Sequence, residues 1–329
     1  ARGHLADPNW GEKARRGQDK LIRKCIGCME CFRILNDGLP LGCTLNPVLG
    51  REFEYGEDKL KVDGAGRKVA VIGGGPAGMQ AAVVLAKREF KVVLFEAEDH
   101  LGGTANLAAI PPNKNMISEF VDTQIAELEE AGVEVRLNTK GTLKNIQEVK
   151  AEAVFLATGG KPVVPGIEGI EKAVTAEDVL AKRAEVRGEN VVVIGGGVTG
   201  LETAEWLSQE HHVSVVEMLN KVGGNLYPSV TLHLVQEIMK NGGQICKGHA
   251  LVRVEDGAAV VKNVQTGEEV SLPADTVILA MGVRSERPEA EELRKEFGPA
   301  LVLVGDASRT GQIYDALHSA YDKAFVFEA

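Results

Sequence analysis

Four cysteines near the amino terminus have a spacing that suits metal chemistry. Cys25, Cys28, Cys31 and Cys43 form the pattern C-x2-C-x2-C-x11-C. Three thiolates on one tight loop suit three corners of an iron–sulfur cube, and the remote fourth cysteine would close it. Structural zinc usually takes two separated cysteine pairs or a mixture with histidine. The nearest downstream histidines lie far along the chain. The spacing therefore favours a [4Fe–4S] cluster at these residues, with zinc and unligated thiols as the alternatives.

Cysteine usage also indicates a compartment. Crowding of four cysteines into one segment is typical of metal binding in a reducing, cytoplasmic setting, whereas secreted proteins use disulfide scaffolds. The fifth cysteine, Cys246, stands alone and is expected to pack as a small hydrophobic residue. The segment around the other four holds little apolar sequence. We therefore expect the bound cluster to hold this small cap together, with one short helix before it over Gly11–Arg23.

A glycine-rich turn between two apolar runs has the pattern of a dinucleotide site. Val69–Ile72 predicts a buried parallel strand, and Gly73–Gly78 fits G-x-G-x-x-G. A helix is expected over Met79–Arg88 and a second strand over Val92–Phe95. Glu96 then follows, roughly 20 residues after the turn, where an acidic residue accepts hydrogen bonds from a ribose.

Each glycine of this turn has its own physical task. Gly73 permits the tight turn, Gly75 lets a pyrophosphate approach the backbone, and Gly78 lets the helix pack close to the strand. The helix N-terminus offers free N–H groups and a positive dipole end to the phosphates. The order of strand, turn, helix, strand and acidic residue therefore predicts dinucleotide binding.

The same arrangement occurs a second time, about 120 residues later. Asn190–Gly224 repeats the strand, the turn and the acidic residue, which is now Glu217. The closing strands repeat as well, at Ala153–Gly159 and Thr276–Gly282. A carboxylate at Glu217 favours NADH over NADPH because it repels a 2′-phosphate, and Lys221 is the one cation close to it.

The last strand and helix return the chain to the first nucleotide domain. Leu301–Asp306 predicts a strand that ends in Gly-Asp, and Ile313–Phe325 predicts a helix. Asp306 can accept a hydrogen bond from a ribityl hydroxyl, and the helix N-terminus can face the electron-rich edge of a reduced flavin. The fold class expected is α/β, with two Rossmann-like dinucleotide-binding domains, the second inserted in the first, preceded by a small iron–sulfur segment.

The domain boundaries follow from these repeats. We expect a connector and cluster segment over 1–62, a first nucleotide domain over 63–165 and 284–329, and a second over 166–283. The 329 residues carry 44% hydrophobic and 26% charged residues and a net charge of −10, which argues against nucleic acid or an anionic membrane as partner. No apolar run approaches the ~18 residues that span a bilayer, and no secretory signal is present.

Several short motifs together resemble a known group of flavoproteins. GGGPAG with Glu96, ATGG at 157–160, GGGVTG with Glu217, AMG at 280–282 and VGD at 304–306 resemble the proteins with two dinucleotide-binding domains. ADPNWGEKARRGQDKLIRKCIGC and CTLNP are similar to the barrel-to-cluster junction of the NADH:flavin oxidoreductases related to 2,4-dienoyl-CoA reductase and trimethylamine dehydrogenase. The resemblance is to the carboxyl-terminal half of that family.

The resemblance implies a set of binding residues for each cofactor. FAD would be held by Gly73, Gly75, Pro76, Ala77, Gly78, Glu96, Gly102, Gly103, Asn106, Thr158, Gly159, Gly305 and Asp306. The nicotinamide nucleotide would be held by Gly195, Gly197, Val198, Thr199, Gly200, Glu202, Glu217 and Gly282. The cluster would be held by the four cysteines named above. No general acid or base is required in this half, so no catalytic residue is named.

In that family an FMN-bearing (β/α)8 barrel precedes this region, and the chain is expected to be a fragment or a separate subunit that lacks it. Electrons would pass from NADH to FAD, then to the cluster, then to FMN in a barrel domain or subunit, in the service of enoyl- or dienoyl-type reduction. One alternative is an amine-dehydrogenase-like half, which would hold ADP in the first site and pass electrons from FMN outward to an electron-transfer flavoprotein. The other is a non-enzymatic ADP-binding scaffold that carries a structural cluster. We also expect a homo-oligomer.

Overall fold

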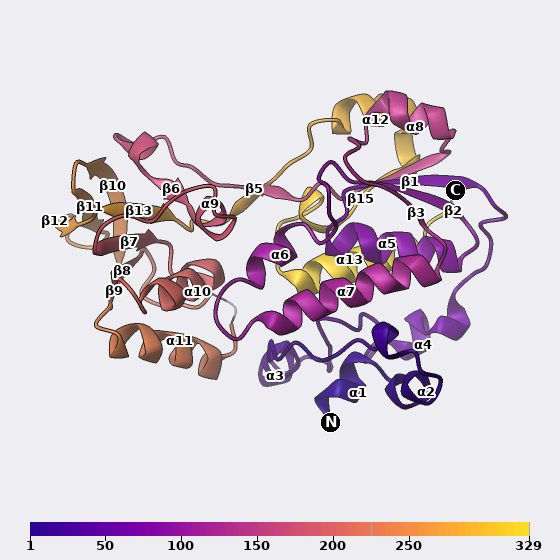
Figure 1. Cartoon of the computed structure of the whole chain (residues 1–329), viewed down its shortest axis with the longest axis horizontal. Coiled ribbons are helices and arrows are strands. Elements are labelled where there is room, and N and C mark those ends of the chain that lie inside the picture. Colours follow the sequence, from indigo (N-terminus) through magenta and orange to yellow (C-terminus); the bar gives the residue numbers. More distant parts are fainter. Residues whose placement is uncertain (225, 329) are drawn as a thin grey trace. The chain divides into compact units, whose positions relative to one another are not determined.

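The chain forms two compact units, and the second interrupts the first. The computed structural model describes residues 1–224 and 226–328. Unit 1 comprises Ala1–Ala109, Lys114–Lys161 and Arg284–Ala329, and unit 2 comprises Ile110–Asn113 and Pro162–Val283 (Figure 1). The cysteine segment therefore belongs to the same unit as the first glycine turn.

Unit 1 is built on a parallel five-stranded sheet with the order β15-β4-β1-β2-β3. Its strands are β1 (Lys68–Ile72), β2 (Lys91–Phe95), β3 (Glu134–Arg136), β4 (Ala153–Leu156) and β15 (Leu301–Leu303). The chain leaves β1 for β2 on one side and reaches β4 on the other. The carboxyl end of β1 is thus the switch point at which such sheets bind ligands, and the first glycine turn lies there.

Both faces of this sheet are covered by helices. Val69 and Val71 point to a core shared with α5 (Pro76–Lys87), α7 (Asn115–Glu130) and α13 (Ile313–Phe325). Ala70 and Ile72 point to the opposite core, shared with α8 (Leu143–Val149) and α12 (Ala290–Phe297). Figure 1 shows the two helical layers on either side of the strands. Burial on both faces explains why β1 is a continuous apolar run without alternation.

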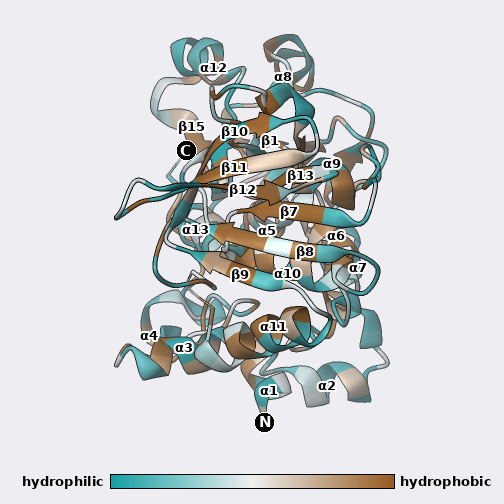
Figure 2. Cartoon of the chain, turned by 90° about the vertical axis from the view of Figure 1, so that its left-hand side faces the viewer, coloured by the Kyte–Doolittle hydropathy of each residue, from teal (hydrophilic) through white to brown (hydrophobic). Residues whose placement is uncertain are grey.

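Unit 2 repeats the plan with a parallel five-stranded sheet, in the order β6-β13-β7-β8-β9. Its strands are β6 (Val174–Thr175), β7 (Asn190–Ile194), β8 (His212–Glu217), β9 (Gln244–Lys247) and β13 (Thr276–Leu279). One face packs against α9 (Ala176–Leu180), α10 (Val198–Leu207) and α11 (Pro228–Lys240). The other face packs against the antiparallel strands β10 (His249–Glu255), β11 (Ala258–Asn263) and β12 (Glu269–Pro273). In Figure 2, β7 and β8 are hydrophobic over most of their length.

The fold class predicted from the sequence is confirmed. The helix expected over Ile313–Phe325 has those bounds, whereas α5 starts at Pro76, three residues before the expected start. Proline suits a first helical turn because its missing N–H would have no helical partner there. The shorter elements are β5 (Gly160–Pro162), β14 (Val283–Ser285), α6 (Thr104–Ala108), and the 3₁₀ turns Ile170–Lys172, Gly298–Ala300 and Gly305–Ala307.

The cysteine segment differs from expectation in two respects. The helix expected over Gly11–Arg23 is only α2 (Trp10–Arg15), because Gly17 takes a φ of 70° and the 3₁₀ turn Asp19–Leu21 follows. The segment also shares an apolar core with α7 and α13, formed by Ala6, Ile26, Leu45, Phe120 and Leu317. The cap is therefore packed against the helices of unit 1 and does not depend on a cluster alone. Its other elements are α1 (Arg2–Ala6), α3 (Glu30–Asn36), α4 (Glu52–Tyr55) and Glu57–Lys59.

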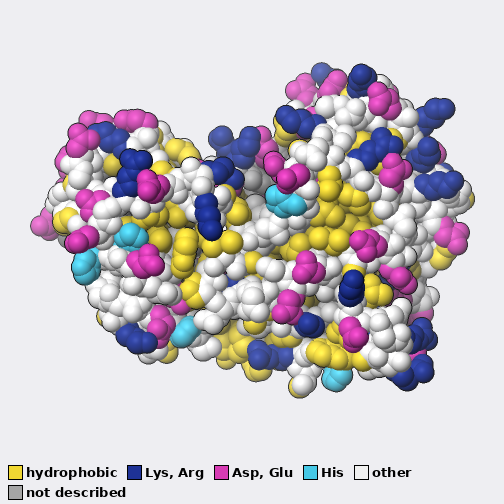
Figure 3. All heavy atoms as spheres, viewed as in Figure 1, with side chains coloured by type: hydrophobic (Ala, Val, Ile, Leu, Met, Phe, Trp, Pro, Cys, Tyr) yellow, Lys and Arg dark blue, Asp and Glu magenta, His cyan; other side chains and the backbone are white. Residues whose placement is uncertain are grey.

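The surface is mixed in charge. On the face shown in Figure 3, acidic and basic side chains are interspersed. Among the described residues, no helix combines the length and apolar character needed to cross a bilayer.

Candidate cofactor sites

The first glycine turn gives each of its three glycines a different environment. Gly73 has a φ of +103°, and a Cβ on it would collide with the carbonyl oxygen of Ala157. A Cβ on Gly78 would collide with the carbonyl oxygen of Gly73, so the helix could not approach the strand. Gly75 has nothing within 4 Å of the Cβ position. One tight turn, one close approach and one open space are what a pyrophosphate site requires.

Glu96 is fixed by the glycine turn itself. Its Oε2 accepts a hydrogen bond from the Gly74 N–H at 2.6 Å, and its Oε1 accepts from the Glu98 N–H at 2.9 Å. The Gly102 N–H donates to the Gly74 carbonyl at 2.9 Å, which holds the following loop over the turn. A Cβ on Gly103 would lie 3.2 Å from the Gly75 Cα. The structure thus brings the turn, the acidic residue and the Gly102–Gly103 loop together.

The carboxyl end of β15 lies against the same turn. A Cβ on Gly305 would lie 2.6 Å from the Ala77 Cβ, at the start of α5. The Asp306 Oδ1 accepts from the Gly311 N–H at 3.0 Å, and burial raises the pKa of this carboxyl. A half-buried carboxylate near a ribityl chain would gain a second partner there. The structure therefore brings the Gly305–Asp306 turn to the start of α5, beside the first glycine turn.

Two other expected FAD residues use their side chains within the protein. The Thr158 Oγ1 donates to the Glu286 carbonyl at 2.6 Å, and the Asn106 Nδ2 donates to the Leu101 carbonyl at 2.9 Å. The Thr158 backbone still borders the turn, because its N lies 3.3 Å from the Cβ position of Gly73. Gly159 follows with a φ of +77°. These residues therefore lie at the site through their backbone and shape the loops around it.

The second turn copies the first. Gly195 has a φ of +110°, and a Cβ on it would collide with the Ala280 carbonyl. A Cβ on Gly200 would collide with the Gly195 carbonyl, while Gly197 has nothing within 4 Å. The Glu217 Oε2 accepts from the Gly196 N–H at 2.7 Å, as Glu96 does in the first turn. Both turns therefore have the geometry of a dinucleotide site.

The other expected residues of the second site occupy matching places. Val198 and Thr199 open α10, whose N-terminal N–H groups point to the turn. Glu202 is buried further along α10. Gly282 has a φ of +86° and follows the carboxyl end of β13.

Sequence reasoning missed one loop of the second site. The Gly223 N–H donates to the Gly196 carbonyl at 2.7 Å, as Gly102 does to Gly74. Gly223 and Gly224 have φ values of +90° and +54°. The pattern that could have revealed them is the repeated Gly-Gly pair, which follows the acidic residue in both halves of the chain.

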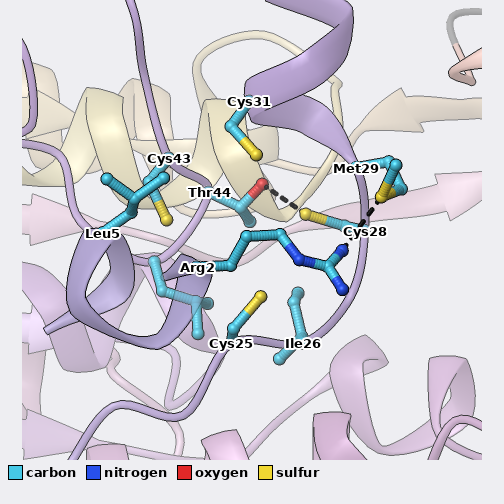
Figure 4. A pocket seen from close by; sticks show the side chains of 10 residues that line it. Arg2, Leu5, Cys25, Ile26, Cys28, Met29, Cys31, Cys43 and Thr44 are labelled. Atoms are coloured by element: carbon cyan, nitrogen blue, oxygen red, sulfur yellow. Dashed lines mark hydrogen bonds between the residues drawn. The ribbon is translucent and has the colours of Figure 1, made fainter.

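The four amino-terminal cysteines line one cavity. Figure 4 shows their sulfur atoms turned toward the same space, which Arg2, Leu5 and Thr44 also line. Within the described part of the chain, no three His, Cys, Asp or Glu side chains are grouped tightly enough for one metal ion. A cube differs from a single ion because each thiolate binds a different iron, so the four sulfurs stand further apart. Four cysteine thiols around one cavity are the ligand set that a cluster of this type uses.

Backbone geometry turns three of these thiols inward. Gly27 and Met29 both have a left-handed conformation, with φ values of 69° and 59°, on either side of Cys28. Cys31 then lies in the first turn of α3. Burial raises the pKa of the Cys43 thiol to about 11, and burial together with Cys28 raises the pKa of Cys31. Metal binding would reverse this preference, because ligation removes the thiol protons.

A largely buried arginine holds the cysteine loop against the helices of unit 1. The Arg23 guanidinium forms a pair with Glu127 of α7 at 2.6 Å. It also donates to the Leu45 carbonyl at 2.6 Å and to the Gln80 side chain at 2.9 Å. Arg23 stands two residues before the first cysteine, and Leu45 two after the last. One side chain therefore ties both ends of the cysteine loop to the helices of unit 1.

His318 on α13 reaches the fourth cysteine. Its Nε2 lies 2.9 Å from the Cys43 carbonyl oxygen. Burial lowers the pKa of this imidazole, which favours its neutral form. A carbonyl oxygen only accepts, so Nε2 carries the proton and donates.

Comparison with known proteins gives the family. The model of the pyridine nucleotide-disulphide oxidoreductase family matches residues 67–312. An NADH oxidase of Thermoanaerobacter brockii is 40% identical over 337 residues, covering 98% of this chain and 50% of the relative. A cinnamate reductase of Clostridium sporogenes is 37% identical over 325 residues, covering 97% of this chain and 48% of the relative. The chain spans about half the length of the curated relatives it matches.

A solved structure agrees over the full chain. The 2-naphthoyl-CoA reductase complex with 2-naphthoyl-CoA superposes with a TM-score of 0.91 at 26% identity, covering 100% of this chain and 50% of that one. The stretch matched by the family model contains one cysteine, Cys246, so it has no cysteine pair for dithiol chemistry. The chain belongs to the pyridine nucleotide-disulphide oxidoreductase family, and it is a flavin-dependent oxidoreductase chain that corresponds to the carboxyl-terminal half of proteins related to 2,4-dienoyl-CoA reductase.

Proposed function

We propose that this chain is the electron-transfer half of an iron–sulfur flavoprotein. It would carry electrons from NADH through FAD and a [4Fe–4S] cluster to an FMN in a barrel outside this chain. The observation that carries the proposal is the cavity lined by Cys25, Cys28, Cys31 and Cys43 in the same unit as the first glycine turn. A flavin accepts hydride and releases single electrons, which a cluster then carries.

The protein's part in this reaction is to bind and position. The open space above Gly75 would admit the FAD pyrophosphate, and the one above Gly197 would admit that of NADH. Glu96 and Glu217 would accept from the ribose of each nucleotide. We assign the cluster segment to residues 1–62, the FAD domain to 63–165 and 284–329, and the NADH domain to 166–283. No residue of this half is required to move a proton.

The relatives suggest the reaction that the whole protein performs. Cinnamate reductase and 2-naphthoyl-CoA reductase carry names of enzymes that reduce an unsaturated acid or thioester. Because this chain spans about half of such proteins, the substrate would bind in the other half, an FMN-bearing barrel domain or subunit. We propose enoyl- or dienoyl-type reduction as the reaction served, in a homo-oligomeric enzyme.

The intact second turn favours this direction of electron flow. The resemblance implies that an amine-dehydrogenase-like half has a degraded second glycine pattern. Here Gly195, Gly197 and Gly200 keep the three environments of the first turn, and Glu217 keeps its bond to Gly196. A second turn preserved to this degree supports entry of electrons from NADH.

The proposal is tested on the chain purified without oxygen. We expect iron and acid-labile sulfide in near-equal amounts, release of FAD on denaturation, and rapid bleaching of the flavin by NADH. Cys43→Ala should lose the cluster, whereas Cys246→Ala, which removes the cysteine of β9, should keep it. Zinc without sulfide would contradict the cluster, and release of ADP without flavin would point to the amine-dehydrogenase-like alternative.

A further inference from the structure

One residue of α13 contacts the peptide of Cys43, the one of the four proposed cluster ligands that lies outside the first loop. Cys43 is separated from Cys31 by an eleven-residue spacer, so the short loop does not fix its position. His318 is 9% exposed and donates from Nε2 to the Cys43 carbonyl. Its ring stacks on Tyr314, one helical turn earlier, with ring centroids 3.7 Å apart. The stacked Tyr314 ring therefore holds the imidazole in the orientation in which it donates to the Cys43 carbonyl.

The neighbours of His318 contact both cofactor loops. The Tyr314 hydroxyl would lie 3.2 Å from a Cβ on Gly42, the residue before Cys43. The Ser319 Oγ accepts from the Gly305 N–H at 3.0 Å, at the turn that leads to Asp306. Two adjacent residues of one helix thus hold the peptide of the fourth cysteine and the turn that we assign to FAD.

The rest of α13 keeps the cysteine segment in register. Asp322, one turn after His318, pairs with Arg51. The Tyr321 hydroxyl donates to the Tyr55 carbonyl at 2.8 Å. Side chains spaced three or four residues apart share one face of a helix, so this face of α13 contacts the chain from Gly42 to Tyr55. The contact at Cys43 is part of a continuous interface within unit 1.

From this geometry we propose that His318 is a positioning residue for the fourth cluster ligand. Its N–H fixes the Cys43 peptide to the helix that also fixes the Gly305 turn, so one helix would hold both the fourth cluster ligand and a turn of the proposed FAD site. The inference rests on the proposed function, because it requires a cluster at the four cysteines. Hydrogen bonds to the sulfurs and solvent exposure affect a cluster's reduction potential. Because His318 holds the Cys43 peptide and not its sulfur, its loss should act on potential and retention through a displaced Cys43.

Two substitutions separate the hydrogen bond from the ring. His318→Phe keeps an aromatic ring beside Tyr314 and removes the donor. His318→Gln places an amide N–H near the Nε2 position and removes the ring. His233→Phe, at an exposed position of α11 in unit 2, is the matched control. Each purified chain is analysed for iron, acid-labile sulfide and FAD content, and for the midpoint potential of the cluster followed by electron paramagnetic resonance.

We expect His318→Phe to lose most of its iron and sulfide, or to retain a cluster with a shifted midpoint potential. His318→Gln should restore the cluster, and His233→Phe should match the unmodified chain. If His318→Phe fails to fold, the cluster content of His318→Gln tests the inference instead. A Gln variant that binds FAD but no cluster would overturn it. Wild-type cluster content and potential in His318→Phe overturn it as well. An unmodified chain without iron and sulfide would instead contradict the proposed function.

Discussion

At the scale of single residues, the two acidic side chains at the strand ends already have partners in the protein. Glu96 accepts from Gly74, and Glu217 accepts from Gly196, each at the middle glycine of its turn. A second oxygen of each carboxylate accepts from the backbone two residues on. Both carboxylates are thus aimed before a nucleotide arrives. A substitution there must keep the acceptor if recognition is to be separated from loop structure.

Glu217→Gln keeps one of the two acceptors, because an amide oxygen can still accept from Gly196 while the charge and the bond from the Leu219 N–H are lost. We expect kcat/KM for NADH to exceed that for NADPH in the unmodified chain, since the carboxylate repels a 2′-phosphate. The substitution should reduce this preference by about tenfold, which corresponds to about 1.4 kcal/mol. Dye reduction with each nucleotide measures it. Glu210→Gln, at an exposed position before β8, is the control, and an unmodified chain that prefers NADPH would refute the assignment.

Asp306 should cost stability in the form without cofactor. Burial raises the pKa of its carboxyl, so the folded state favours the neutral acid. The stability that the neutral carboxyl contributes to the folded state is fully present below the unfolded pKa of about 3.9. This stability is lost as the pH rises through the raised pKa of the folded state. Asp306→Asn mimics the neutral acid and keeps an oxygen for the Gly311 N–H. The variant should therefore gain stability over the unmodified chain as the pH rises toward neutrality.

Urea unfolding of the FAD-free chain at several pH values tests the expectation for Asp306. Exposed Asp19→Asn is the control and should follow the unmodified chain throughout. Parallel stability curves for Asp306→Asn and the unmodified chain would show that this carboxyl makes no pH-dependent contribution.

At the scale of elements, the close packing of helix on strand depends on single glycines. A Cβ on Gly78 or on Gly200 would meet a carbonyl oxygen of the preceding turn. Such overpacking costs about 1–3 kcal/mol and should displace the helix N-terminus from the phosphates. Gly78→Ala should lose FAD, and Gly200→Ala should keep FAD and lose NADH-driven flavin bleaching. Gly11→Ala in α2, where nothing lies within 4 Å, is the control. Full FAD content in Gly78→Ala would contradict the packing argument.

Elements with a strong local pattern could be predicted from the sequence, and contacts between distant segments could not. α13 was expected with its observed bounds, because its periodicity and flanking turn are local. β1 was expected because its apolar run is continuous. The short α3 was not expected, since its seven residues include Cys31 and the cysteine spacing dominates the pattern there. Its N-cap, Met29, adopts a left-handed conformation that methionine rarely takes.

The same limit applies to the candidate sites. The spacing of the glycines and cysteines indicates which of them would lie at a cofactor, because the role of each depends on its local sequence. Arg23 and Glu127 are 104 positions apart, and His318 and Cys43 are 275 apart. Nothing in the local sequence of either pair indicates its partner. These supports become visible only when α7 and α13 are packed on the sheet of unit 1.

At the scale of the whole molecule, the chain is a duplication to which one feature has been added. Both units have a parallel five-stranded sheet with a glycine turn at the end of the central strand. The cavity with four thiols is in unit 1, at the segment that precedes β1. A hydride donor and a hydride acceptor can occupy two similar sites. A cluster bound in unit 1, as we propose, would give electrons an exit from the FAD site of the same unit toward the amino-terminal segment.

The whole-molecule prediction is that this chain alone accepts electrons from NADH but does not reduce an enoyl thioester. The two units account for all its residues, and a (β/α)8 barrel would need about 250 more. The curated relatives are about twice as long, so the substrate site should lie in what they have in addition. NADH-dependent dye reduction is measured beside an enoyl-CoA assay, with and without an added FMN-bearing barrel protein. We expect dye reduction in both cases and enoyl reduction only with the barrel, because the cluster alone offers no site that orients a carbon–carbon double bond.

Cys43→Ala should abolish the barrel-dependent reaction, since electrons could no longer leave the flavin through the cluster. Enoyl reduction by the isolated chain in the absence of FMN would mean that the substrate site lies within the two units described above.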